Sequence, residues 1–100
     1  MPEFLYMLRL VRGDMLRTGP TEAEQAVVAE HFAYLQDMNA EGVIVLVGRT
    51  LTTDENTMGL AIFRAESEDA ARKIMDCDPA VQKAVMTPTL HPFKVILRGN

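Results

Sequence analysis

Residues Val43 to Ala65 read VIVLVGRTLTTDENTMGLAIFRA, and this stretch decides the fold. It opens with an unbroken run of β-branched and aliphatic residues, which is typical of a strand. The segment TTDENT (52–57) is rich in residues that favour turns, and GLAIFRA (59–65) has the composition of a second strand. We therefore predict a hairpin of two antiparallel strands in the middle of the chain.

The residues before the hairpin predict a strand followed by a long helix. FLYMLRLV (4–11) is apolar at seven of its eight positions and ends at a polar breaker, which indicates the first strand. Thr21 and Glu24 then have the spacing of a capping box, in which each side chain bonds a free backbone N–H of the other residue. Apolar residues recur at helical spacing until Gly42, a natural left-handed stop, so we expect a helix over about residues 22–40.

The residues after the hairpin predict a second helix, a short third one and a last strand. Ser67 caps a helix with an acidic first turn, and this helix ends near Asp76. Asp78-Pro79 joins a good cap to a residue that fits the first helical position, which predicts a short helix through about Met86. Phe93–Leu97 is the expected fourth strand.

The element order βαββαβ predicts a ferredoxin-like α+β fold, a four-stranded antiparallel sheet with both helices on one face. Residues 1–100 are expected to form a single domain, because this length suits one core. The first two strands are apolar on both sides, so the open face of the sheet needs a cover. A second copy is the economical one, giving a dimeric α+β barrel. A larger oligomer, or a monomer whose open face is a ligand groove lined by Tyr6 and Leu8, is the alternative.

Composition and charge exclude several classes of protein. Ten basic and 14 acidic residues give a net charge of −4 with no basic cluster, so we expect no nucleic acid partner. No apolar run approaches the roughly 20 residues of a membrane-spanning helix, and we expect a cytoplasmic protein without a signal peptide. The single cysteine, Cys77, excludes an internal disulfide and is assigned to packing, and the two histidines lack metal-binding spacing.

His31 is the first candidate for chemistry. It follows Val28 by three residues and precedes Leu35 by four, so it shares the helix face directed at the sheet, where an unpartnered imidazole is costly. At a rise of about 1.5 Å per helical residue, His31 and Asp78 both lie near mid-height of the sheet and are expected to meet. A carboxylate beside an imidazole fixes its tautomer, as general acid/base catalysis requires. His31 is thus the acid or base and Asp78 its orienting partner, while a structural histidine and a simple helix cap are the alternatives.

Two arginines are candidates for binding a substrate. Arg9 and Arg49 interrupt or end apolar strands, and each guanidinium is suited to a carboxylate, phenolate or enolate ligand. Surface ion pairs are the alternative. Gly48 lets a ligand approach the backbone beside Arg49. His91, by contrast, is expected to be an exposed, solvated residue.

Short motifs occur in a fixed order from about Phe4 to Leu97: His31-Phe32-x-x-Leu35, Gly42 and Gly48 around a strand, Glu66-Ser67 with Ala70-Ala71, Asp78-Pro79, and Pro92-Phe93. Together they resemble the YciI-like (YCII-related) family of the dimeric α+β barrel superfamily. The resemblance implies a homodimer with a cleft in each subunit and an active-site pair that corresponds to His31 and Asp78. Many members carry Gly-Pro where this chain has Gly48-Arg49, so the pocket wall differs there.

Two functional hypotheses follow. The first is a cofactor-independent enzyme that moves a proton on a small anionic or aromatic molecule, and no metal or other cofactor is expected. Fold relatives such as lactone isomerases, dehalogenating enzymes and cofactor-free monooxygenases are compatible with it, although fold does not fix chemistry. The second is a non-catalytic dimeric module that binds a small ligand or a partner. Acylphosphatase shares the element order, but Asp14 would repel phosphate in the loop after the first strand.

Overall fold

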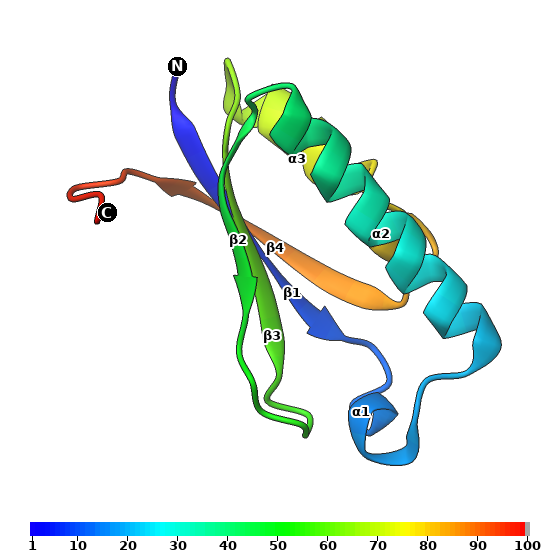
Figure 1. The fold of residues 1–100 in the computed structure, drawn as a ribbon. Coiled ribbons are helices and arrows are strands. Elements are labelled where there is room, and N and C mark those ends of the chain that lie inside the picture. Colours follow the sequence, from blue (N-terminus) through cyan, green and yellow to red (C-terminus); the bar gives the residue numbers. More distant parts are fainter. Residues whose placement is uncertain (100) are drawn as a thin grey trace.

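The computed structural model describes residues 1–99 and contains one antiparallel sheet with helices packed on one of its faces (Figure 1). The elements are β1 (Glu3–Leu10), α1 (Met15–Thr18), α2 (Glu22–Ala40), β2 (Ile44–Arg49), β3 (Met58–Arg64), α3 (Glu68–Asp76), α4 (Pro79–Gln82) and β4 (Met86–Phe93). The strand order β2-β3-β1-β4 is that of a ferredoxin-like sheet. The predicted fold class is confirmed.

The two main helices begin and end at the residues that the sequence predicted. The Thr21 side chain accepts a hydrogen bond from the backbone N–H of Glu24, and the Glu24 carboxylate accepts one from the backbone N–H of Thr21. Gly42, just beyond the end of α2, has a φ of +79°. A residue with a Cβ rarely adopts this left-handed conformation. Ser67 caps α3 by accepting from the backbone N–H of Ala70.

The last strand lies earlier in the chain than predicted. β4 covers Met86–Phe93 and pairs with β1, whereas residues 94–97 of the predicted strand are not in the sheet. Pro88 and Pro92 are tolerated in β4 because it is an edge strand, where missing N–H donors need not interrupt a ladder. The aliphatic run at Val95 has strand composition but pairs with no strand of residues 1–99.

Two short helices also differ from the prediction. α4 ends at Gln82 rather than at about Met86, because Ala84 has a left-handed φ of +56° that turns the chain into β4. α1 was not predicted; it is a single turn between β1 and α2, and its Met15 is buried. Cys77 is exposed rather than packed in the core, because it lies beyond the end of α3.

Side chains of β1 alternate between the two faces of the sheet. Phe4, Tyr6 and Leu8 point toward the helices and are buried in the core. Leu5 and Met7 point to the opposite side, which we call the outer face, and are half-buried. Tyr6 and Leu8 therefore lie on the helix side and not on the open face, where the monomer alternative placed them.

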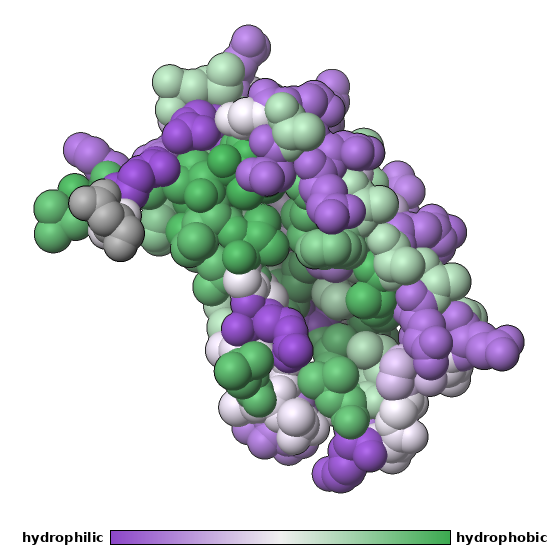
Figure 2. All heavy atoms as spheres, viewed as in Figure 1, coloured by the Kyte–Doolittle hydropathy of each residue, from purple (hydrophilic) through white to green (hydrophobic). Residues whose placement is uncertain are grey.

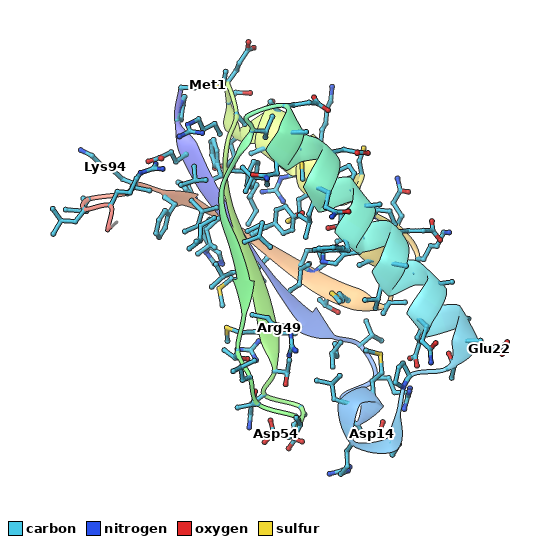
Figure 3. The ribbon with its side chains drawn as sticks, in the orientation of Figure 1. Met1, Asp14, Glu22, Arg49, Asp54 and Lys94 are labelled. Carbon is cyan, nitrogen blue, oxygen red and sulfur yellow. The ribbon has the colours of Figure 1, made fainter. Side chains whose placement is uncertain are left out.

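The core fills the space between the sheet and the helices, as the side chains in Figure 3 show. Phe63 of β3 is fully buried and meets the Tyr6 ring edge-on, with their centroids 5.4 Å apart. Leu35 and Met38 of α2 pack against the same cluster. A second tyrosine, Tyr34, joins α2 to α3 by donating a hydrogen bond to the carbonyl oxygen of Ile74 at 2.6 Å.

The outer face and the segment after β4 leave apolar side chains exposed. Leu46 is 55% exposed and Ile96 77% exposed, and Figure 2 shows apolar surface gathered between the sheet and this segment. Within residues 1–99 no helix is both long and apolar enough to cross a membrane.

The two tyrosines predict how the fold responds to alkali. Burial raises the pKa of Tyr34 to about 12, and burial together with the neighbouring Asp78 carboxylate raises the pKa of Tyr6 further. An unfolded chain ionises its tyrosines near pH 10. The stability that the buried neutral rings contribute is therefore complete below about pH 10 and is lost as the pH rises toward and beyond 12.

Phenolate absorbance at 295 nm is thus expected to be absent near pH 10, to appear from Tyr34 near pH 12, and to appear from Tyr6 only together with loss of the circular dichroism of the fold. Because the chain has only these two tyrosines, the signal has no other source. A phenolate titration centred near pH 10, with the circular dichroism unchanged, would show that a tyrosine is solvated in the native state.

Candidate functional site

The site is built around a fully buried carboxylate, that of Asp78 between α3 and α4. Its Oδ2 accepts a hydrogen bond from the Tyr6 hydroxyl at 2.9 Å. Its Oδ1 accepts one from the backbone N–H of Ala80 at 2.9 Å, which caps α4. His31 Nδ1 lies 2.8 Å from Oδ1 and 2.7 Å from Oδ2. Three elements therefore supply donors to one carboxylate, as a buried charge requires.

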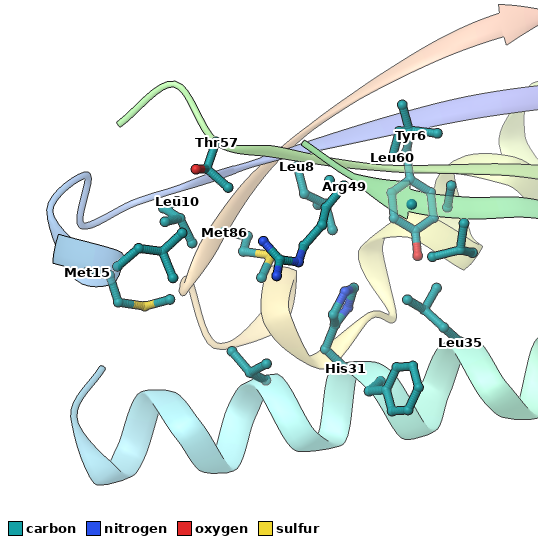
Figure 4. Close-up of a pocket in the computed structure, with 17 residues that line it drawn as sticks. Tyr6, Leu8, Leu10, Met15, His31, Leu35, Arg49, Thr57, Leu60 and Met86 are labelled. Carbon is teal, nitrogen blue, oxygen red and sulfur yellow. The ribbon is translucent and has the colours of Figure 1, made fainter. Parts of the chain in front are cut away.

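His31 presents one ring nitrogen to Asp78 and the other to solvent. Its side chain is 14% exposed and projects from α2 toward the sheet (Figure 4). A carboxylate only accepts hydrogen bonds, so the short contact requires the proton to be on Nδ1. No group of residues 1–99 hydrogen-bonds Nε2, and no unpartnered side-chain nitrogen is buried in this part of the chain, so solvent reaches Nε2. In the neutral imidazole Nε2 then carries a free lone pair.

A cavity of about 560 Å³ lies between α2 and the sheet, and His31 is one of its walls. This volume falls in the range of small-molecule sites, roughly 300 to 1,000 Å³. Most of the wall is apolar, including Leu8, Leu10, Met15, Val28, Leu35 and Met86. No carboxylate side chain of residues 1–99 is part of it. The cavity therefore favours a largely apolar ligand and does not repel a negative charge.

Arg49 supplies the positive charge of this cavity. The pairing of β2 with β3 places Arg49 opposite Gly59, on the helix side of the sheet, and its guanidinium points toward His31 and Met86 (Figure 4). Its one hydrogen bond within residues 1–99 goes to the carbonyl oxygen of Thr50. Most of its donors therefore remain available to an anion.

Arg9, the other candidate arginine, lies elsewhere. It is exposed on the outer face of β1, opposite Met58 of β3 and Thr87 of β4 in the strand register. The structure does not bring it near His31. The second histidine, His91, is also exposed on the outer face, in agreement with its assignment as a solvated residue.

The loop between β1 and α2 closes one end of the cavity with Met15. Arg12 fastens this loop: its guanidinium donates to both carboxylate oxygens of Glu24, at 3.0 and 2.6 Å, and to the carbonyl oxygen of Gly19 at 2.9 Å. The Arg12 hydrogen bonds hold the pKa of Glu24 at about 2, so the pair stays ionised across neutral pH. Thr18 accepts a further bond from Arg12.

Sequence reasoning brought His31, Asp78 and Arg49 to one place but missed Tyr6 and Met15. Two signals could have found Tyr6. It alternates with Phe4 and Leu8, which predicts that the three share one face of the sheet. A buried tyrosine hydroxyl also needs a hydrogen-bond partner. Met15 had no signal, because its single helical turn was not predicted. In residues 1–99 no three His, Cys, Asp or Glu side chains lie close enough together to share a metal ion.

Comparison with known proteins gives a family and a fold relative. The family model of the YCII-related domain matches residues 5–93. No curated protein matches the chain. A solved structure with the same fold is the 5-chloro-2-hydroxyhydroquinone dehydrochlorinase of Burkholderia phenoliruptrix AC1100, in complex with 2,5-dihydroxybenzoquinone. The two chains are 24% identical with a TM-score of 0.64, over 91% of this chain and 93% of that one. By its match over almost all of its length, this chain belongs to the YCII-related family.

Proposed function

We propose that this protein is a cofactor-independent enzyme that transfers a proton to or from a small anionic or aromatic organic molecule. The observation that carries the proposal is the arrangement of His31: Nδ1 is held by a buried carboxylate, while Nε2 is open to solvent beside an apolar cavity. His31 is the acid or base, and Asp78 fixes its tautomer and stabilises the imidazolium that forms. Arg49 binds the negative charge of the substrate or the charge that develops on it.

The cavity supports this class of substrate in two ways. Its apolar walls suit a ring or a short carbon skeleton, and Arg49 contributes a fixed cation across from the imidazole. A molecule with an oxyanion on Arg49 and an acidic C–H or O–H at Nε2 satisfies both. The enzyme of similar fold, which was solved with 2,5-dihydroxybenzoquinone, suggests a small oxygenated ring as a first probe.

The second candidate function is binding without catalysis. It is favoured by the structural role of Asp78, which caps α4 and joins three elements regardless of any reaction. On that reading His31→Ala lowers the free energy of unfolding by about 1–3 kcal/mol. Bound ligands are then recovered chemically unchanged.

Deuterium incorporation tests the enzyme hypothesis before the complete reaction is known. A panel of small phenols, hydroxyquinones and enolisable carboxylic acids is incubated with the protein in D₂O, and carbon-bound deuterium is measured by NMR and mass spectrometry. Wild type is expected to accelerate exchange in at least one compound, and His31→Gln to slow it by roughly 10²- to 10⁴-fold, the usual contribution of a general acid/base.

His91→Gln is the matched control, because that histidine lies on the side of the sheet opposite the cavity, and the variant is expected to keep full activity. Retention of wild-type exchange by a folded His31→Gln variant would refute the assigned role. No exchange with any compound, combined with tight binding of one of them, would favour the binding module.

The two arginines provide a second test, of ligand binding alone. Arg49→Gln is expected to weaken binding of 2,5-dihydroxybenzoquinone, because one charge-assisted hydrogen bond contributes about 1.5–3 kcal/mol, or roughly 10- to 100-fold in Kd. Arg9→Gln removes the same charge from the outer face and is expected to leave Kd unchanged. Isothermal titration calorimetry measures both. Equal effects of the two changes would mean that net charge, and not the cavity arginine, attracts the ligand.

We also propose that a second copy of this chain covers the outer face. Leu5 and Met7 of β1 point to this face, Leu46 is 55% exposed and Phe93 is 38% exposed. Apolar side chains from neighbouring strands form a continuous surface there, and a self-complementary patch of this kind pairs most simply through a two-fold axis.

Sedimentation velocity is expected to give twice the mass of one chain for wild type. Ile62 pairs with Leu5 and lies on the outer face, so Ile62→Lys is expected to yield monomers by placing a charge in the contact. Leu51→Lys, at an 82% exposed position in the hairpin loop, is expected to remain dimeric. A monomeric wild type would contradict the proposal.

A further inference from the structure

We infer that Tyr6 is a positioning residue of the site: its hydroxyl fixes the plane of the Asp78 carboxylate and thereby sets which ring nitrogen of His31 carries the proton. The inference rests on the proposed function for its meaning, but its geometry and its test do not require a substrate.

The first observation is the symmetry of the contact between His31 and Asp78. Nδ1 lies 2.8 Å from Oδ1 and 2.7 Å from Oδ2, so the ring nitrogen faces both oxygens at once. A carboxylate that turned freely about its Cβ–Cγ bond would present a single oxygen in most orientations. Something therefore holds its plane.

Two donors hold that plane, one on each oxygen. The backbone N–H of Ala80 binds Oδ1, and this bond exists wherever an Asp caps a helix. Oδ2 has only the Tyr6 hydroxyl besides His31 within residues 1–99. Without the Tyr6 hydroxyl, only the bond from Ala80 to Oδ1 opposes rotation of the carboxylate about its Cβ–Cγ bond. With the hydroxyl present, both oxygens are held.

Tyr6 is itself firmly held. It is fully buried, its ring meets Phe63 edge-on, and its strand pairs on both sides, with Ala61 on β3 and with Leu90 on β4. Burial and the adjacent Asp78 carboxylate raise the pKa of its hydroxyl, which therefore stays protonated and keeps donating. A group on a central strand is a rigid support for an active-site side chain.

The consequence concerns the neutral imidazole. When both oxygens of Asp78 face the ring, the proton stays on Nδ1 and the Nε2 lone pair is directed at the cavity. When Oδ2 turns away, the alternative tautomer, with its proton on Nε2, becomes accessible and blocks the lone pair that a base needs.

The test is the tautomer of His31, read from the ¹⁵N chemical shifts of its two ring nitrogens at a pH where the ring is neutral. The chain has two histidines, and His91, on the side of the sheet opposite Asp78, is an internal reference. Wild type is expected to show His31 protonated at Nδ1. Tyr6→Phe keeps the ring and its packing, and is expected to lower the ratio of the Nδ1-protonated to the Nε2-protonated form by up to about tenfold, which is the factor that one hydrogen bond typically contributes.

Tyr34→Phe is the matched control. It also removes a hydroxyl that donates a hydrogen bond near the core, but its acceptor is the Ile74 carbonyl, so the His31 ratio is expected to stay at the wild-type value. An unchanged ratio in a folded Tyr6→Phe variant, or an equal change in Tyr34→Phe, overturns the inference.

If Tyr6→Phe does not fold, the wild type alone decides. A nuclear Overhauser contact between the Tyr6 hydroxyl proton and the His31 Nδ1 proton supports the inference, and a wild-type His31 protonated on Nε2 overturns it. Neither result depends on whether deuterium exchange into a substrate is observed. The positioning role and the proposed enzyme activity can therefore fail separately.

Discussion

The buried carboxylate of Asp78 is the constraint on which the site depends. A charge without contact to solvent is stable in a protein only when donors surround it, and each donor here belongs to a different element. Tyr6 belongs to β1, His31 to α2 and the Ala80 N–H to α4. The sheet, the long helix and the connecting turn are therefore joined at one point. The same bonds that satisfy the charge also orient the imidazole.

How much of this the sequence predicted depends on how local each signal is. The capping box of Thr21 and Glu24 and the stop at Gly42 involve residues within a few positions of each other, and the structure has them where expected. The contact of His31 with Asp78 is not local, but it followed from counting helical rise on two helices whose ends were known from their caps. Well-defined caps thus fixed a contact between residues 47 positions apart.

The errors arose where structure depends on pairing. A strand needs a neighbour, and composition alone does not supply one: residues 94–97 have strand composition, yet the sheet takes the segment with Pro88 and Pro92. Alternation has a period of two, so a shift of one residue exchanges the faces of a strand. The strand register therefore places Arg49 on the cavity side of the sheet and Arg9 on the outer face. It also decides that Tyr6 meets Asp78, which neither the length nor the composition of β1 indicates.

The two layers of the fold restrict what the cavity can accept. His31 approaches from a helix and Arg49 from the sheet, so a ligand reaches both only by lying between the layers. Asp78 is sealed from solvent and is not part of the cavity wall, so it cannot contact that ligand directly, whereas Tyr6 is also fully buried but lines the cavity. Proton transfer is therefore left to Nε2 and charge binding to the guanidinium. A ring or short chain with one negatively charged oxygen meets these conditions, whereas a dianion with two distant charges would have to leave one of them against apolar side chains, where charge is unfavourable.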